Sequence, residues 1–184
     1  MKKILVFILL SMMLTLAACG QKSPAAETPQ STAAVQLANP WHDITEAEAR
    51  EICPRSFVVP EGAENVNWSV MDSAADPSGV PGALVQLSFD LNGNSFTARE
   101  QVTGDTEIDQ SGMYYDWTVE DESDLQFWAD GKMPCKTYRY FDENGFADLC
   151  TWYDKENGVS YSLSVTAKDL DGFDLRAVAG AMYG

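Results

Sequence analysis

Histidine and cysteine, which often act as bases, nucleophiles or metal ligands, are scarce in this chain of 184 residues. His42 is the single histidine, so imidazole catalysis, including any Ser-His-Asp triad, would depend on that residue. No Gly-x-Ser-x-Gly sequence presents a serine nucleophile, and no GxxxxGK[ST] or GxGxxG sequence offers a nucleotide site. These absences predict a protein that is not an enzyme and that uses no cofactor.

Carboxylates are abundant, with 28 aspartates and glutamates, and a pair of them could serve a hydrolase of surface glycans or peptides. The sequence singles out no such pair. The run Asp169-x-Asp171-Gly172-x-Asp174 resembles part of an EF-hand loop, but its glycine is fourth instead of sixth, and position twelve is Gly180. Helix capping explains these aspartates better, and no Cys-x-x-Cys pair exists for zinc, so we expect no metal site.

The N-terminus has the pattern of an export signal. Two lysines precede an apolar run from Ile4 to Leu16, which is shorter than the roughly 20 apolar residues of a membrane span. The following Leu-Ala-Ala-Cys resembles the lipobox of bacterial lipoproteins, whose cysteine receives acyl chains such as palmitate. We therefore expect residues 1–18 to be a lipoprotein signal peptide and Cys19 to anchor the protein to the cell membrane, outside the cytoplasm.

The segment after Cys19 predicts a tether and then one domain. Residues 21–38 are rich in Ala, Pro, Ser, Thr and Gln and contain no aromatic residue, which is typical of a flexible linker. Aromatic and periodic residues begin at Asn39-Pro40-Trp41. We expect residues 19–38 to be the lipidated cysteine and tether, and residues 39–184 to be a single domain.

Three further cysteines allow at most one internal disulfide, which an extracytoplasmic location permits. A hairpin turn that ends at Gly145 places Cys150 opposite residue 138 or 139. Cys135 then lies beyond the roughly 4.4–6.8 Å Cα separation that a disulfide needs. We therefore expect Cys53 to pair with Cys150 or Cys135, which would attach the first helix to the sheet. Three reduced thiols are the alternative.

Charge limits the class of partner. Lys and Arg number 12 against 28 acids, for a net charge of −16, so nucleic-acid binding and adsorption to anionic lipid are both disfavoured. Hydrophobic residues make up 45%, which is enough for a folded core.

Period-two patterns predict an α+β fold: a single antiparallel sheet of about six or seven strands with an N-terminal and a C-terminal helix. Thr45 and Glu48 fit a capping box for the first helix, and Asp171 or Asp174 would cap the last. Asn92-Gly93 predicts a type I′ hairpin turn that pairs Phe89 with Phe96. Residues 120–124 are acidic and are expected to form a loop. The strands are expected at 66–72, 84–91, 94–102, 113–119, 136–141, 146–153 and 159–166.

Aromatic residues occur on both faces of several predicted strands. Tyr114 lies opposite Tyr115 and Trp117, Tyr138 and Tyr140 share a face, and Trp152 and Tyr153 point in opposite directions. Such a sheet could expose aromatic rings to a peptide, glycan or protein ligand. The candidate binding-face aromatics are Tyr114, Tyr138, Tyr140 and Trp152. Coverage of both faces by helices and loops is the alternative.

Short motifs give the chain a resemblance to uncharacterised Gram-positive cell-surface lipoproteins. They are Asn39-Pro40-Trp41, Ala47-Glu48-Ala49, Tyr161-Ser162-Leu163-Ser164 and the terminal helix. Similar domains of unknown function occur in membrane proteins that resemble anti-sigma factors. The resemblance implies an antiparallel sheet with helices and supplies no catalytic residue. We therefore expect a lipid-anchored binding or sensing module. The alternatives are a carboxylate hydrolase and a structural partner protein of the envelope.

Overall fold

The strictest alternation in the sequence forms the strand at the centre of the fold. In β8 (Val159–Ala167), Tyr161 and Leu163 are fully buried on one side, and β8 pairs on both edges, with β4 (Asn94–Val102) and β7 (Gly145–Asp154). The computed structural model describes residues 39–72 and 79–184. The predicted signal peptide, the tether and Cys19 lie outside the described residues.

Within the described residues, eight strands form one antiparallel sheet in the order β1-β2-β3-β4-β8-β7-β6-β5. The remaining elements are β1 (Trp41–Ile44), α1 (Glu46–Ile52), β2 (Glu64–Met71), β3 (Leu84–Leu91), β5 (Val119–Leu125), the 3-10 helix η1 (Trp128–Gly131), β6 (Met133–Asp142) and α2 (Leu175–Ala181). The predicted α+β architecture, with one helix near each end of the domain, is confirmed.

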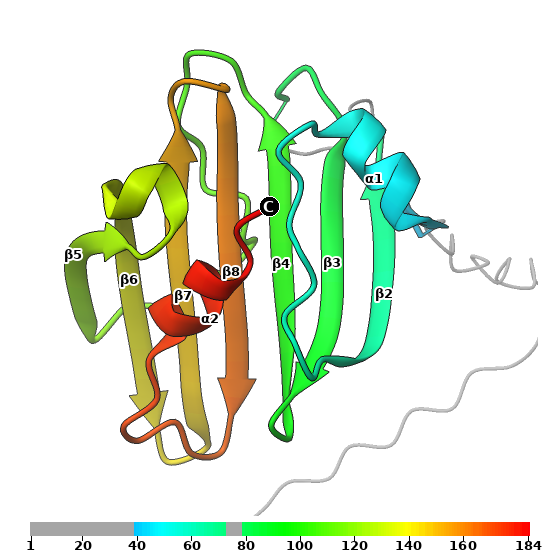
Figure 1. Cartoon of the computed structure of the whole chain (residues 1–184). Coiled ribbons are helices and arrows are strands. Elements are labelled where there is room, and N and C mark those ends of the chain that lie inside the picture. The colour runs from blue at the N-terminus through cyan, green and yellow to red at the C-terminus, as the bar shows by residue number, and fades with distance from the viewer. Residues whose placement is uncertain (1–38, 73–78) are drawn as a thin grey trace, which may run out of the picture. The chain divides into compact units, whose positions relative to one another are not determined.

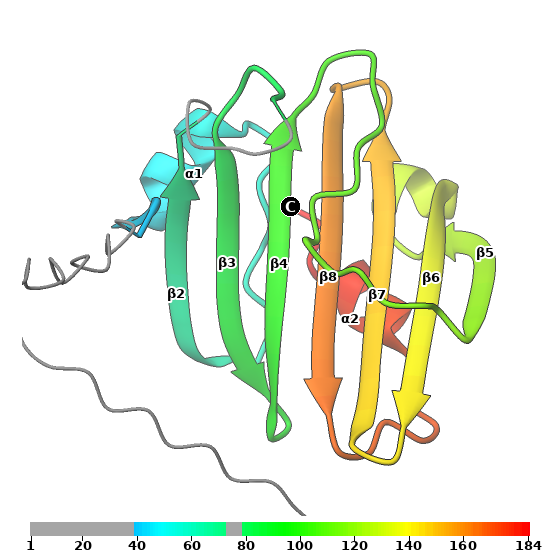
Figure 2. The same ribbon diagram turned by 180° about the vertical axis from the view of Figure 1, so that it is seen from behind.

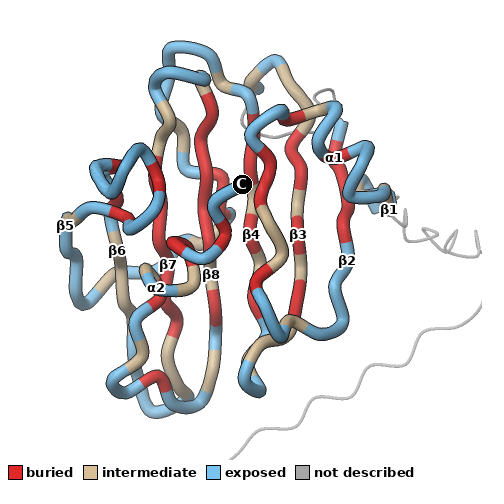
Figure 3. Tube along the Cα trace, in the orientation of Figure 1, coloured by how far each residue is buried: buried red, intermediate tan, exposed pale blue. Residues whose placement is uncertain are grey.

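The two faces of the sheet have different surroundings. Both helices, η1 and the chain after α1 lie over one face, which we call the helix side (Figure 1). The connection from β4 to β5, residues 103–118, runs across the opposite face, which we call the open side (Figure 2). Buried residues concentrate in the central strands, whereas β5 and the turns are mostly exposed (Figure 3). The main hydrophobic core therefore lies on the helix side.

Predicted caps explain where both helices begin. The Thr45 hydroxyl accepts from the backbone N–H of Glu48 at 3.2 Å, and the Glu48 carboxylate accepts from the backbone N–H of Thr45 at 2.7 Å. This reciprocal pair is the predicted capping box. Asp174 caps α2 by accepting from the backbone N–H of Arg176 at 3.0 Å.

The β3–β4 hairpin has the predicted turn and register. Phe89 pairs with Phe96 and their rings stack at 5.2 Å between centroids. Asn92 and Gly93 both have positive φ, as a type I′ turn requires.

The β6–β7 hairpin differs from the prediction by its turn. Asp142 pairs with Gly145, so the two-residue loop is Glu143-Asn144. The Asp142 carboxylate stabilises this loop by accepting from the backbone N–H of Asn144 at 2.7 Å. Gly145 serves another purpose: a Cβ atom there would lie 2.5 Å from the carbonyl oxygen of Ala167. The register expected for Cys150 was therefore wrong: it pairs with Thr137, which places Cys135 on the same face of the sheet and two residues away.

The predicted strand at 113–119 is absent, and the acidic residues that follow it form β5 instead. β5 pairs with β6 alone and lies at the edge of the sheet, so water solvates its acidic side chains. The four-residue strand β1, at the other edge, was not predicted because it is too short to show a period. Seven strands were predicted and eight are observed, because β5 replaces the strand expected at 113–119 and β1 is additional.

Candidate ligand-binding face

Hydroxyl-bearing side chains line the centre of the open side. The serines that alternate with the buried residues of β8 point this way, and the register places Thr97 and Thr151 beside them. Arg99 of β4 lies opposite Ser162 and adds a positively charged side chain to this side of the sheet. The side chains on this side of the sheet are Thr97, Arg99, Tyr138, Tyr140, Thr151, Ser162, Ser164 and Thr166, of which Thr151 and Ser162 are buried.

Hydrogen bonds hold the segment 103–118 against this surface. Ser160 accepts from the backbone N–H of Ile108 at 3.0 Å, and the Tyr153 hydroxyl donates to the carbonyl of Gly104. Arg99 donates to the carbonyl of Ser111 at 2.8 Å, and burial lowers the pKa of this guanidinium. The segment is thus anchored to β4, β7 and β8.

A row of aromatic rings forms where the segment reaches β6. Tyr115 stacks on Tyr140 with 5.0 Å between centroids, and Trp117 packs on Tyr138 at 5.5 Å. Tyr115 and Trp117 also contact each other at 5.4 Å. We call these four residues the aromatic row. Tyr114 lies next to it and is 94% exposed.

Two hollows meet at Tyr115. One, of about 490 Å³, lies between β4, β8 and the segment, and Arg99, Tyr114 and Ser164 are among its lining residues. The other, of about 350 Å³, has Tyr115, Tyr140 and Thr166 in its wall. Aromatic rings beside hydroxyl groups suit a ligand that has apolar faces and many hydrogen-bonding groups.

Three of the four candidate aromatics lie on the open side or its segment, and one does not. Tyr138 and Tyr140 point to the open side, and Tyr114 projects from the segment. Trp152 was assigned to the wrong face: it is 2% exposed in the core of the helix side, where it stacks on Tyr161 at 5.2 Å. Alternation shows which residues share a face, but it does not show which face the helices cover.

Sequence reasoning missed Tyr115, Trp117 and Arg99 as members of this surface. The first two alternate as in a strand and were placed on the face opposite the candidate Tyr114. Their alternation instead reflects packing on β6 by a segment that is not a strand. The regular serines of β8 were the available signal for a polar face.

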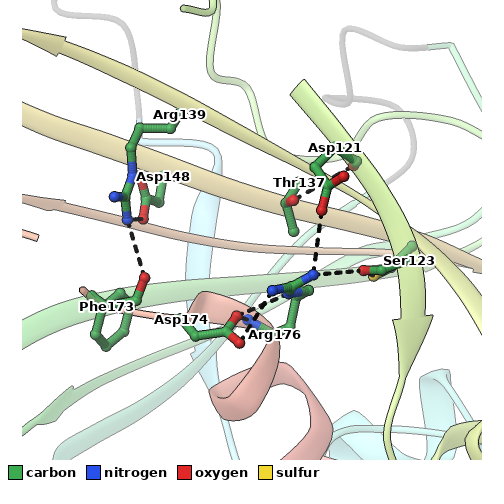
Figure 4. A network of polar contacts seen from close by, with 9 residues as sticks. Asp121, Ser123, Thr137, Arg139, Asp148, Phe173, Asp174 and Arg176 are labelled. Atoms are coloured by element: carbon green, nitrogen blue, oxygen red, sulfur yellow. Dashed lines mark hydrogen bonds and ion pairs between the residues drawn. The ribbon is translucent and has the colours of Figure 1, made fainter. Parts of the chain in front are cut away.

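A second polar cluster lies on the helix side, at the start of α2 (Figure 4). Arg139 donates to Asp148 from Nε at 2.7 Å and from Nη2 at 2.6 Å, and this pairing raises the pKa of Arg139. Arg176 binds Asp174 at 2.9 Å and Asp121 at 3.4 Å. A hollow of about 290 Å³ adjoins the cluster. Each of its three carboxylates pairs with an arginine.

The predicted link between Cys53 and Cys150 or Cys135 is not present. All three described cysteines are buried free thiols. Burial and the neighbouring Glu100 raise the pKa of Cys53, whereas Cys135 and Cys150 interact with each other. All three belong to one buried cluster, but neither Cys135 nor Cys150 is among the groups that shift the pKa of Cys53.

Within residues 39–72 and 79–184, no group of three or more His, Cys, Asp or Glu side chains is arranged to hold a metal ion. Over the same ranges, none of the helices has the length and apolar character needed to cross a membrane. The chain matches no protein-family model, no curated protein and no solved structure.

Proposed function

We propose that the protein is a lipid-anchored, extracytoplasmic binding module whose open side holds a glycan strand without catalysis. The observation that carries the proposal is the aromatic row, in which Tyr115 lines both hollows beside hydroxyl side chains. The pyranose faces of a sugar are apolar and its edge is rich in hydroxyl groups. A glycan can therefore stack on Tyr115 and bond to residues such as Ser164.

Charge favours a neutral glycan over an anionic one. The net charge of −16 repels polyanions at long range, and Arg99 already donates to the carbonyls of Ser111 and Gln110. We therefore expect contacts of the stacking and neutral hydrogen-bonding kinds. The proposed anchor at Cys19 and the tether that follows would present this face to polymers of the cell surface.

Replacing Tyr140 by alanine is expected to weaken glycan binding about two- to twelvefold, because it removes one stacked ring worth about 0.5–1.5 kcal/mol. Titration calorimetry with neutral oligosaccharides of glucose and of N-acetylglucosamine measures this. Phe141→Ala is the matched control, since Phe141 is the next residue, is 47% exposed and stacks on Phe146 on the helix side. Equal affinity of Tyr140→Ala and wild type, or no binding by wild type, would contradict the proposal.

Replacing Cys19 by serine is expected to abolish acylation, since a thioether to diacylglycerol needs the thiol. The measurement is incorporation of labelled palmitate into the full chain in a bacterial host. Cys53→Ser is the matched control and should be labelled like wild type. Labelling of Cys19→Ser at the wild-type level would overturn the proposed anchor, and it would leave the glycan proposal untouched.

A further inference from the structure

Two of the buried thiols are diagonal neighbours on adjacent strands. Cys135 of β6 lies opposite Trp152, and Cys150 of β7 lies opposite Thr137, so the two cysteines share the helix side and are offset by two residues. The Cα atoms of such diagonal neighbours lie about 7–8 Å apart, so a bond between the two sulfurs requires a small movement of the backbone. Their relative exposures are 3% and 0%, and the two thiols interact, since each shifts the pKa of the other.

The surroundings of these thiols make them chemically unequal. The Ser123 hydroxyl lies 3.5 Å from the Cys135 sulfur, and Arg176 donates to that hydroxyl at 3.1 Å (Figure 4). Interaction with the Cys150 thiol, with help from Ser123 and Arg176, lowers the pKa of Cys135 to about 7, although burial and Asp124 act in the opposite direction. Interaction with the Cys135 thiol, together with burial, raises the pKa of Cys150.

We propose that Cys135 and Cys150 form a redox pair, which thiol–disulfide exchange with an external disulfide converts into an intramolecular disulfide. The Cys135 thiolate attacks one sulfur of the external disulfide, whose other sulfur leaves as a thiolate and takes up a proton. Cys150 then gives up its proton and attacks the Cys135 sulfur, which expels the second external thiolate. Two cysteine thiols are oxidised, and one external disulfide is reduced to two thiols.

Access to Cys135 comes from the edge of the sheet. Ser123, which covers its sulfur, belongs to β5, and that edge strand pairs with β6 alone. Local separation of an edge strand costs less than global unfolding, so a small disulfide can reach Cys135 in the folded protein. Cys53 has no neighbouring thiol partner among the groups that shift its pKa, which are Glu100, Arg55 and Asp154.

The test uses the full chain, purified reduced in detergent and equilibrated with oxidised glutathione at pH 7. Peptide mapping without reductant should show Cys135 linked to Cys150, with Cys53 still open to alkylation. Dithiothreitol should restore both thiols. A link that includes Cys53, a glutathione adduct that persists on Cys135, or three thiols that stay free at equilibrium would each overturn the proposal.

Variants separate the attacking thiol from the resolving one. Cys150→Ser should accumulate a stable glutathione adduct on Cys135, and Cys135→Ser should accumulate none on Cys150. Cys53→Ser is the matched control and should oxidise within about twofold of the wild-type rate. An adduct on Cys150 in the Cys135→Ser variant would overturn the order of attack. Circular dichroism would show whether a variant fails to fold. The peptide map of the wild-type protein tests the proposal in either case.

Discussion

Raising the pH from about 4.5 to about 8 is expected to destabilise the folded domain, and Glu100→Gln is expected to remove most of that loss. Glu100 is 0% exposed in β4, where its carboxyl accepts from the Ser56 hydroxyl at 2.5 Å and from the backbone N–H of Phe57 at 3.2 Å. Burial outweighs these hydrogen bonds and raises its pKa from 4.5 to about 8. The folded state therefore favours the neutral acid.

Proton linkage determines whether the free energy of unfolding rises or falls with pH. Because the folded pKa lies above the unfolded one, the contribution of Glu100 to stability is fully present below about 4.5. It is lost as the pH rises through about 8. Each unit of pKa difference corresponds to about 1.4 kcal/mol, so the total loss amounts to a few kcal/mol. Cys53, Tyr161 and Arg50 are the ionisable groups that interact with this carboxyl.

Urea unfolding of wild type and Glu100→Gln at several pH values between 4.5 and 8.5 measures the effect. The free energy of unfolding should fall with pH in the wild type and much less in the variant. Glu122→Gln, an exposed change in β5, is the matched control and should keep the wild-type slope. A wild-type slope in Glu100→Gln would show that another group governs the pH dependence.

Trp152→Ala is expected to lower the free energy of unfolding by about 3–5 kcal/mol, because it empties the centre of the helix-side core. The Trp152 ring contacts Phe57 at 6.0 Å, Trp128 at 5.2 Å and Tyr161 at 5.2 Å between centroids. Its indole N–H makes no hydrogen bond within the described residues, so packing accounts for the loss. Trp152→Phe should therefore cost less than Trp152→Ala.

Tyr114→Ala provides the matched control for this prediction, since Tyr114 was assigned to the same binding face but is 94% exposed. Its free energy of unfolding should stay within about 0.5 kcal/mol of wild type. Urea unfolding at constant pH measures both variants. A loss below about 1 kcal/mol in Trp152→Ala would contradict the core position of this ring.

Local chemistry in the sequence was sufficient to predict most elements of the fold. The capping box at Thr45 and the Asn92-Gly93 turn act over a few residues, and both are present as predicted. The β6–β7 register was missed because two turns competed for neighbouring residues. Gly145 indicated the turn, whereas its missing side chain actually makes room for Ala167.

The candidate site was harder to predict because it depends on long-range placement. Nothing local to Tyr115 indicates that its ring will stack on Tyr140, 25 positions away, in a segment that crosses the sheet without joining it. Trp152 shows the same limit, because period-two alternation assigns residues to faces without saying which face is covered. The position of the helices determines which face is covered, and that position depends on contacts between residues far apart in the sequence.

The two edges of the sheet have a consequence for association between copies of the protein. An unpaired edge strand can template further strands, which leads to fibres or aggregates. Here β1 is only four residues long, and β5 carries Glu120, Asp121, Glu122 and Asp124 along its length. Two β5 edges brought together would place these like charges against each other. The acidic side chains of β5 therefore oppose pairing of this edge with the edge of a second copy. We expect the protein to remain unaggregated at high concentration.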